Sequence, residues 1–87
     1  MWTVNVDEAV WDRLAKIPNP DKRRITQAIY GLEDDLGSLD IKKLKGRSGY
    51  RLRVGKWRII MDIDKEEKVI FVYFLASRGE VYKNKNQ

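Results

Sequence analysis

Three arginines lie within one short stretch of the chain, and their spacing suggests chemistry on a phosphate. Arg51 and Arg53 alternate with apolar residues, which is the period-2 pattern of a strand with one buried face. Gly55-Lys56 has the Gly-X form of a two-residue type II′ turn, which would place Arg53 directly opposite Arg58 on the returning strand. Because like charges that face each other destabilise a sheet, we expect an anion to sit between them. Arginine suits phosphate through bidentate, charge-assisted hydrogen bonds.

The residue types that the chain lacks narrow this chemistry further. The sequence contains no cysteine and no histidine, and no group of Asp and Glu residues has the spacing of a metal site. A two-metal nuclease is therefore disfavoured. The remaining route to RNA cleavage needs no metal: a ribose 2′-hydroxyl attacks the adjacent phosphate in line, and cations stabilise the additional charge of the transition state. We therefore predict no metal and no cofactor.

Two residues near the C-terminus are candidates for the same site. Arg78 follows the last apolar stretch, and it joins the arginine face only if the turn at residues 65–68 gives the right strand parity. Tyr82 lies in the tail, where a tyrosine beside a basic cluster could stack on a base. The alternatives are that Arg78 is a strand-end charge paired with Glu80, and that Tyr82 covers the edge of the core.

The positive charge of the chain is concentrated around these arginines. Residues 41–61 hold eight basic and no acidic side chains, whereas residues 1–40 hold five basic and eight acidic ones. Such a patch favours a polyanion, with RNA or DNA first, and the alternative is a solvated basic face that serves solubility. The side chains expected to attract RNA or the ribosome from around the site are Lys43, Lys45, Arg47 and Lys56.

The N-terminal half predicts a strand followed by two helices. Trp2–Val6 alternates large apolar and polar residues as a strand does, and Asp7 can cap the helix that follows. Asn19 is the expected N-cap of the second helix, with Pro20 at its first position and Gly37 at its C-terminal end. The two helices would form a short hairpin with its apolar side towards a sheet.

The C-terminal half predicts the strands of that sheet. We expect a linker over residues 38–49, then the arginine hairpin, then a central strand over Val69–Ala76. The order β-α-α-β-β-β indicates an α+β fold in one domain over residues 1–87, with mostly antiparallel strands and both helices on one sheet face. Since the helices need the apolar face, the three arginines must lie on the other. Val69–Ala76 is also the longest apolar run, and it is too short to span a bilayer, so no membrane partner is expected.

Three segments together resemble a known family. Lys43–Gly46, Tyr50–Ile60 and Arg78–Tyr82 closely resemble the corresponding segments of RelE-type toxins of the RelE/ParE superfamily, and the resemblance extends over essentially the whole chain. It implies a RelE-like fold and an mRNA endonuclease that works in the ribosomal A site. It also implies a cognate antitoxin, a toxin–antitoxin hetero-oligomer as a candidate assembly, and the cytoplasm of a bacterium or archaeon.

The resemblance also implies a role for each matching residue. Arg51 and Arg53 match two basic residues, often lysines, on the first hairpin strand, and Arg58 matches a phosphate-binding arginine. Arg78 matches a basic residue that is proposed to protonate the leaving oxygen, and Tyr82 matches a tyrosine that stacks on or orients the nucleotide. An arginine almost never gives up its proton, so Arg51 cannot replace a lysine as a base. We therefore expect catalysis that is mainly electrostatic and positional.

Two other functions remain open at this stage. A ParE-like protein shares the fold and inhibits DNA gyrase without cutting RNA, and a non-enzymatic RNA-binding module would also use a basic sheet. The combination of the three hairpin arginines with Arg78 and Tyr82 favours the nuclease, because a gyrase inhibitor does not need convergent phosphate-binding groups.

Overall fold

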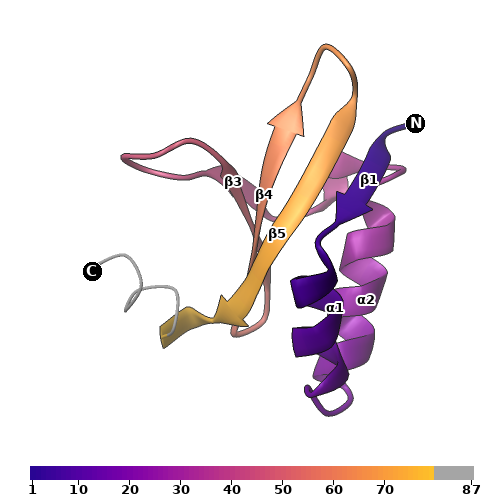
Figure 1. Ribbon diagram of the computed structural model, residues 1–87, viewed down its shortest axis with the longest axis vertical. Coiled ribbons are helices and arrows are strands. Elements are labelled where there is room, and N and C mark those ends of the chain that lie inside the picture. The colour runs from indigo at the N-terminus through magenta and orange to yellow at the C-terminus, as the bar shows by residue number, and fades with distance from the viewer. Residues whose placement is uncertain (80–87) are drawn as a thin grey trace.

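The computed structural model describes residues 1–79 and shows two helices packed against one face of a five-stranded sheet (Figure 1). The elements in chain order are β1 (Thr3–Val6), α1 (Glu8–Ala15), α2 (Asp21–Gly31), the 3₁₀ turn η1 (Leu36–Ser38), β2 (Ile41–Lys43), β3 (Tyr50–Val54), β4 (Trp57–Asp64) and β5 (Val69–Ser77). The strand order is β1-β5-β4-β3-β2, in which only the β1–β5 pair is parallel. The predicted α+β fold is confirmed, and β2 is a strand that the sequence did not predict.

The first helix begins where the sequence predicts. The Asp7 side chain accepts a hydrogen bond of 2.9 Å from the Ala9 backbone N–H, which satisfies one amide of the first turn. Val10 and Leu14 lie one turn apart and are both buried, so this side of α1 packs on the sheet. Within residues 1–79, neither helix is long and apolar enough to cross a membrane.

The limits of the second helix differ from the prediction. α2 begins at Asp21 with Pro20 at the N-cap position, and no side chain caps it, so the expected cap by Asn19 is wrong. Backbone carbonyls of the preceding turn accept the first amide hydrogens instead. The helix ends at Gly31, a poor helix former, so Gly37 falls in η1 rather than at the end of α2.

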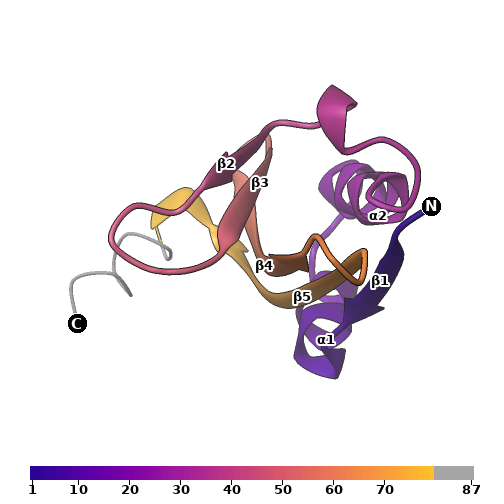
Figure 2. The same ribbon diagram turned by 90° about the horizontal axis from the view of Figure 1, so that it is seen from above.

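The core lies between the helices and the sheet, and Figure 2 shows both helices on the same side of the strands. The largest side chains that are less than 2% exposed are Val10, Ile25, Ile29, Leu32, Leu52, Ile59, Met61, Ile70 and Val72. Burying each such side chain stabilises the fold by about 1.5–3 kcal/mol, so the face of the sheet that packs on the helices forms the core. The opposite face, called the open face below, is covered by neither helix.

A break in strand register decides which residues reach the open face. The pairing between β4 and β5 shifts by one residue after Ile60, and Tyr73 is the additional residue on β5. A bulge of this kind changes the side to which the following residues point. Leu75 is therefore part of the core, and Ala76 lies opposite Arg58.

Candidate phosphate-binding site

The hairpin of β3 and β4 has the predicted register. Arg53 pairs with Arg58, Arg51 pairs with Ile60, and the two strands are joined by Gly55 and Lys56. Gly55 has a φ of 59°, which fits the first central position of a type II′ turn. The turn therefore fixes the two arginines opposite each other, as the sequence predicted.

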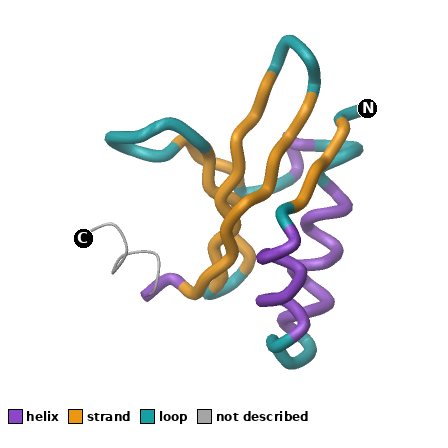
Figure 3. Tube along the Cα trace, viewed as in Figure 1, coloured by secondary structure: helices purple, strands orange, loops and turns teal. Residues whose placement is uncertain are grey.

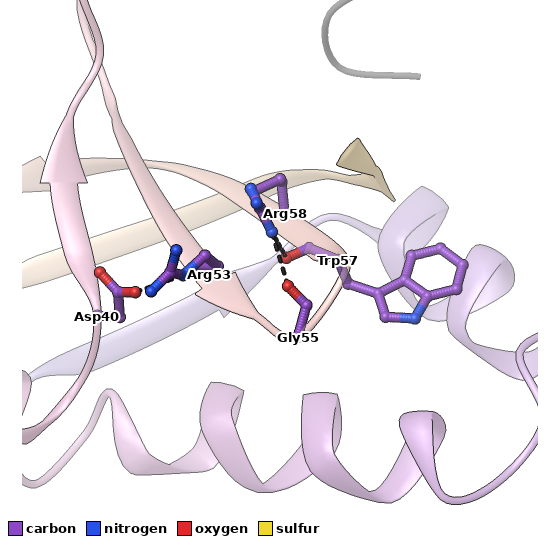
Figure 4. A network of polar contacts seen from close by, with 5 residues as sticks. All are labelled: Asp40, Arg53, Gly55, Trp57 and Arg58. Atoms are coloured by element: carbon purple, nitrogen blue, oxygen red, sulfur yellow. Dashed lines mark hydrogen bonds and ion pairs between the residues drawn. The ribbon is translucent and has the colours of Figure 1, made fainter. Parts of the chain in front are cut away.

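Arg58 is a buried charge on the open face, with 7% of its surface exposed. Figure 4 shows Arg58 and Trp57 leaving β4 in opposite directions, with Trp57 on the side of the helices. Arg58 Nη1 donates to the carbonyl oxygens of Gly55 at 2.9 Å and of Trp57 at 3.0 Å. These bonds hold the guanidinium against the hairpin turn.

Arg53 forms an ion pair at the surface. Its Nε lies 2.6 Å from Oδ2 of Asp40, and the two side chains are 56% and 34% exposed (Figure 4). Exposed pairs of this kind contribute only about 0.2–1 kcal/mol. A phosphate that reaches Arg53 can therefore displace the Asp40 carboxylate at low cost.

Arg51 carries a buried donor without a partner. Its Nε is shielded from solvent and makes no hydrogen bond with the described part of the chain. A buried polar group that lacks a hydrogen bond costs about 1–3 kcal/mol.

Arg78 lies beside the hairpin turn. Its backbone N–H donates to the carbonyl oxygen of Lys56 at 2.8 Å, and its side chain is exposed. The bulge places Ala76 opposite Arg58, but β5 ends at Ser77, so strand alternation does not assign the Arg78 side chain to a face and its place in the site stays a prediction. Tyr82 and Glu80 lie outside the described residues, so the predictions for them stay predictions.

The four basic residues that were predicted to attract RNA lie in the neighbouring loop, strand end and turn, and not beside the arginines on the strands. Lys43 is the last residue of β2, and Lys45 and Arg47 lie in the loop that follows it. Figure 3 shows that this loop extends away from the helices. Lys56 occupies the hairpin turn, with its Nζ 5.7 Å from the centre of the Trp57 ring. All four side chains are exposed, which suits long-range attraction of a polyanion.

The described residues offer no alternative centre for metal chemistry. Residues 1–79 contain no group of three or more His, Cys, Asp or Glu residues placed to hold a metal ion. The arginines on this face are of the type that can bind a phosphate and stabilise negative charge that develops on it.

Solved structures match the chain over most of its length. The archaeal RelE–RelB complex from Pyrococcus horikoshii OT3 has 28% identity and a TM-score of 0.75, covering 90% of this chain and 96% of that one. The RelB–RelE antitoxin–toxin complex from Methanococcus jannaschii has 26% identity and a TM-score of 0.76, covering 92% and 96%. The chain has the fold of the RelE-type toxins. The predicted resemblance to that branch of the RelE/ParE superfamily is confirmed.

More distant RelE structures agree in fold alone. The isolated RelE toxin from E. coli has 20% identity and a TM-score of 0.65, covering 98% of this chain and 95% of that one. No protein-family model matches the chain. No curated protein sequence matches it either.

Two features of this RelE-like site were missed at the sequence level. Asp40 reaches Arg53 because β2 pairs with β3, and its carbonyl also accepts a 3.0 Å bond from the Arg53 N–H. Asp21 binds the Trp57 indole across 36 residues of sequence. No local pattern signals either contact, since both depend on tertiary pairing.

Proposed function

We propose that this protein is the toxin of a type II toxin–antitoxin system and acts as a metal-independent, ribosome-dependent mRNA endonuclease. The RelE-type fold supports a toxin, since the matching structures include RelE in complex with RelB. The observation that carries the nuclease assignment is the pairing of Arg53 with Arg58 on the open face. Two arginines that are opposite each other on paired strands can bind one anion together, and a phosphate in RNA is the anion that the nearby basic residues would attract.

The proposed reaction is transfer of the scissile phosphate to the neighbouring ribose. The 2′-oxygen forms a bond to phosphorus, the bond to the 5′-oxygen of the next nucleotide breaks, and a 2′,3′-cyclic phosphate and a 5′-hydroxyl result. The phosphorus centre gains negative charge in the transition state, and Arg53 and Arg58 stabilise it. A guanidinium keeps its protons, so water accepts the proton of the 2′-hydroxyl and supplies one to the leaving oxygen.

The two arginines differ in what they contribute to this step. Arg53 is exposed and can follow the phosphate as it enters, exchanging its Asp40 partner for a phosphate oxygen. Arg58 is buried and held by the turn, so its charge is already in place before the substrate arrives. A charge that is preorganised where negative charge develops in the transition state is often the largest single contribution to catalysis.

The same open face accounts for the proposed partners. In the cytoplasm, a toxin with this basic face must be kept from binding RNA until it is needed. An acidic antitoxin that folds on binding would cover the face in a toxin–antitoxin hetero-oligomer. In the ribosomal A site the mRNA would present its phosphates to the arginines, while Lys43, Lys45, Arg47 and Lys56 contact ribosomal RNA. Arg51 and Arg78 flank the reacting phosphate in this arrangement, and Tyr82 is the residue proposed to stack on the nucleotide.

Expression in cells tests the proposal against its main alternative. After brief induction without an antitoxin, the 5′ ends of cellular mRNA are mapped, and chromosomal DNA is examined for gyrase-dependent breaks. The proposal predicts cuts that keep the codon phase of translated messages and disappear from the same message when its start codon is removed. Intact mRNA together with gyrase-dependent breaks would overturn it in favour of ParE-like inhibition.

A further inference from the structure

The hairpin turn that holds Arg58 is tied to the helices by one tryptophan. Trp57 Nε1 donates a hydrogen bond of 2.9 Å to Oδ2 of Asp21, the first residue of α2. The Trp57 ring also lies 5.9 Å from the guanidinium carbon of Arg13 on α1 and 5.7 Å from Nζ of Lys56. One side chain therefore contacts both helices and the turn.

The backbone of the same tryptophan holds the buried arginine. The Trp57 carbonyl oxygen and the Gly55 carbonyl oxygen both accept hydrogen bonds from Arg58 Nη1. Because Trp57 and Arg58 are adjacent in β4 and point to opposite faces, a movement of the Trp57 residue moves the acceptors that orient Arg58 (Figure 4). The contact with Asp21 on the helix side is thus connected to the charge on the open face by a single peptide unit.

The bond to Asp21 is suited to fixing this turn. Asp21 lies in the first turn of α2, where the helix dipole stabilises a negative side chain. A carboxylate acceptor makes a stronger hydrogen bond than a neutral one. Both side chains are half-buried, so water competes less with the bond than it would at an exposed site.

We infer that Asp21 and Trp57 are positioning residues that fix the guanidinium of Arg58 for the scissile phosphate. The inference rests on the proposed nuclease function. Neither residue touches the open face; both act through the Trp57 and Gly55 carbonyl oxygens. A small displacement of such a donor lowers the cleavage rate much more than it weakens substrate binding, because the donor interacts with charge that develops only in the transition state.

The test uses four variants on programmed ribosomes under single-turnover conditions. Asp21→Ala removes the acceptor, Asp21→Asn keeps an oxygen acceptor, and Trp57→Phe keeps a ring without the donor. Asp12→Ala is the matched control, since Asp12 is an exposed acid on α1 and its loss changes the net charge equally. Each variant gives a cleavage rate at saturating toxin and a half-saturating toxin concentration. The side-chain Nε–Hε NMR signal of Arg58 is recorded for each free protein.

We expect Asp21→Ala and Trp57→Phe to lower the saturating cleavage rate by about tenfold while changing the half-saturating concentration by less than about twofold. The cleavage rates of Asp21→Asn and of Asp12→Ala are both expected to stay within about twofold of the rate of the unchanged protein. An Asp21→Ala variant with an unchanged rate, or an Asp12→Ala variant with the same loss, would overturn the inference.

The NMR arm separates this inference from the proposed function. A shifted or broadened Arg58 signal in Asp21→Ala, with an unchanged signal in Asp12→Ala, supports the link between helix and arginine even if the unchanged protein cuts no mRNA. In that case only the nuclease proposal fails. An Arg58 signal that is identical in Asp21→Ala and the unchanged protein refutes the link whatever the cleavage assay shows.

Discussion

Removing Asp40 should make the protein bind the ribosome more tightly. In the free protein the Asp40 carboxylate neutralises Arg53, one of the two arginines that face each other on the open face. A phosphate must displace this carboxylate before it can pair with Arg53. Asp40→Ala removes the competitor and leaves Arg53 ready for the phosphate.

The exposure of the ion pair sets the size of this effect. With 56% and 34% of the two side chains exposed, the pair belongs to the surface class and contributes about 0.2–1 kcal/mol. That free energy opposes phosphate binding, so its removal should raise the affinity by about 1.4- to 5-fold. The gain should shrink as salt is added, because screening already weakens the ion pair in the unchanged protein.

A substrate that cannot be cleaved allows binding to be measured separately from cleavage. Ribosomes are programmed with mRNA that carries a 2′-deoxyribose at the attacked position, so the proposed reaction cannot occur. Toxin affinity is then measured for Asp40→Ala, Arg53→Ala and the double variant. Glu66→Ala, an exposed acid in the turn between β4 and β5, controls for the change in net charge.

The double variant shows whether Asp40 acts on ribosome binding through Arg53. Asp40→Ala should bind more tightly, Arg53→Ala more weakly, and removing Asp40 from the Arg53→Ala protein should have no further effect, because Asp40 acts only through Arg53. An affinity gain of the same size in the presence and absence of Arg53, or in Glu66→Ala, would show that general charge and not this pair is responsible.

Three further predictions concern stability, each measured by urea unfolding followed by circular dichroism. Ile59→Ala should cost about 2–5 kcal/mol, because Ile59 is 0% exposed and lies in the core under the arginine hairpin; a smaller loss would contradict its place there. Asp7→Ala should cost about 1 kcal/mol through loss of the cap on α1, and Asp7→Asn much less, since asparagine caps equally well. Gly55→Ala should cost about 1–2 kcal/mol from backbone strain alone, since no atom lies within 4 Å of an added Cβ and φ is 59°; an unchanged midpoint would argue against the positive φ.

The part of the site that the sequence predicted correctly is the part set by local chemistry. Gly55 and Lys56 determine a two-residue turn, and the turn determines which arginines face each other. The alternation of apolar and basic residues on β3 assigned the arginines to the face away from the helices. Asp7 could be recognised as a cap because that role depends only on the next few residues.

The parts that were missed depend on contacts between distant segments. β2 has three residues and lies between turns, so its sequence carries too little periodicity to predict a strand. The bulge at Tyr73 falls within a continuous apolar run, where no polar residue marks a change of face. The position of Ala76 opposite Arg58 follows from that bulge, and the Asp40–Arg53 pair follows from β2, so neither could be predicted from local patterns.

The most direct test of the account compares the two facing arginines in cleavage. Arg53→Ala and Arg58→Ala are assayed under single-turnover conditions on ribosomes programmed with unmodified mRNA, with Arg23→Ala on the exposed side of α2 as the control. Removing one preorganised donor should lower the rate by about 10²–10³-fold for Arg58→Ala. Arg53→Ala should lose rate and affinity together, and Arg23→Ala should lose neither. Because Arg53 is exposed, its variant is expected to fold even if Arg58→Ala does not. Cleavage at the unchanged rate by folded Arg53→Ala and Arg58→Ala proteins would contradict the central claim that this arginine pair binds the scissile phosphate.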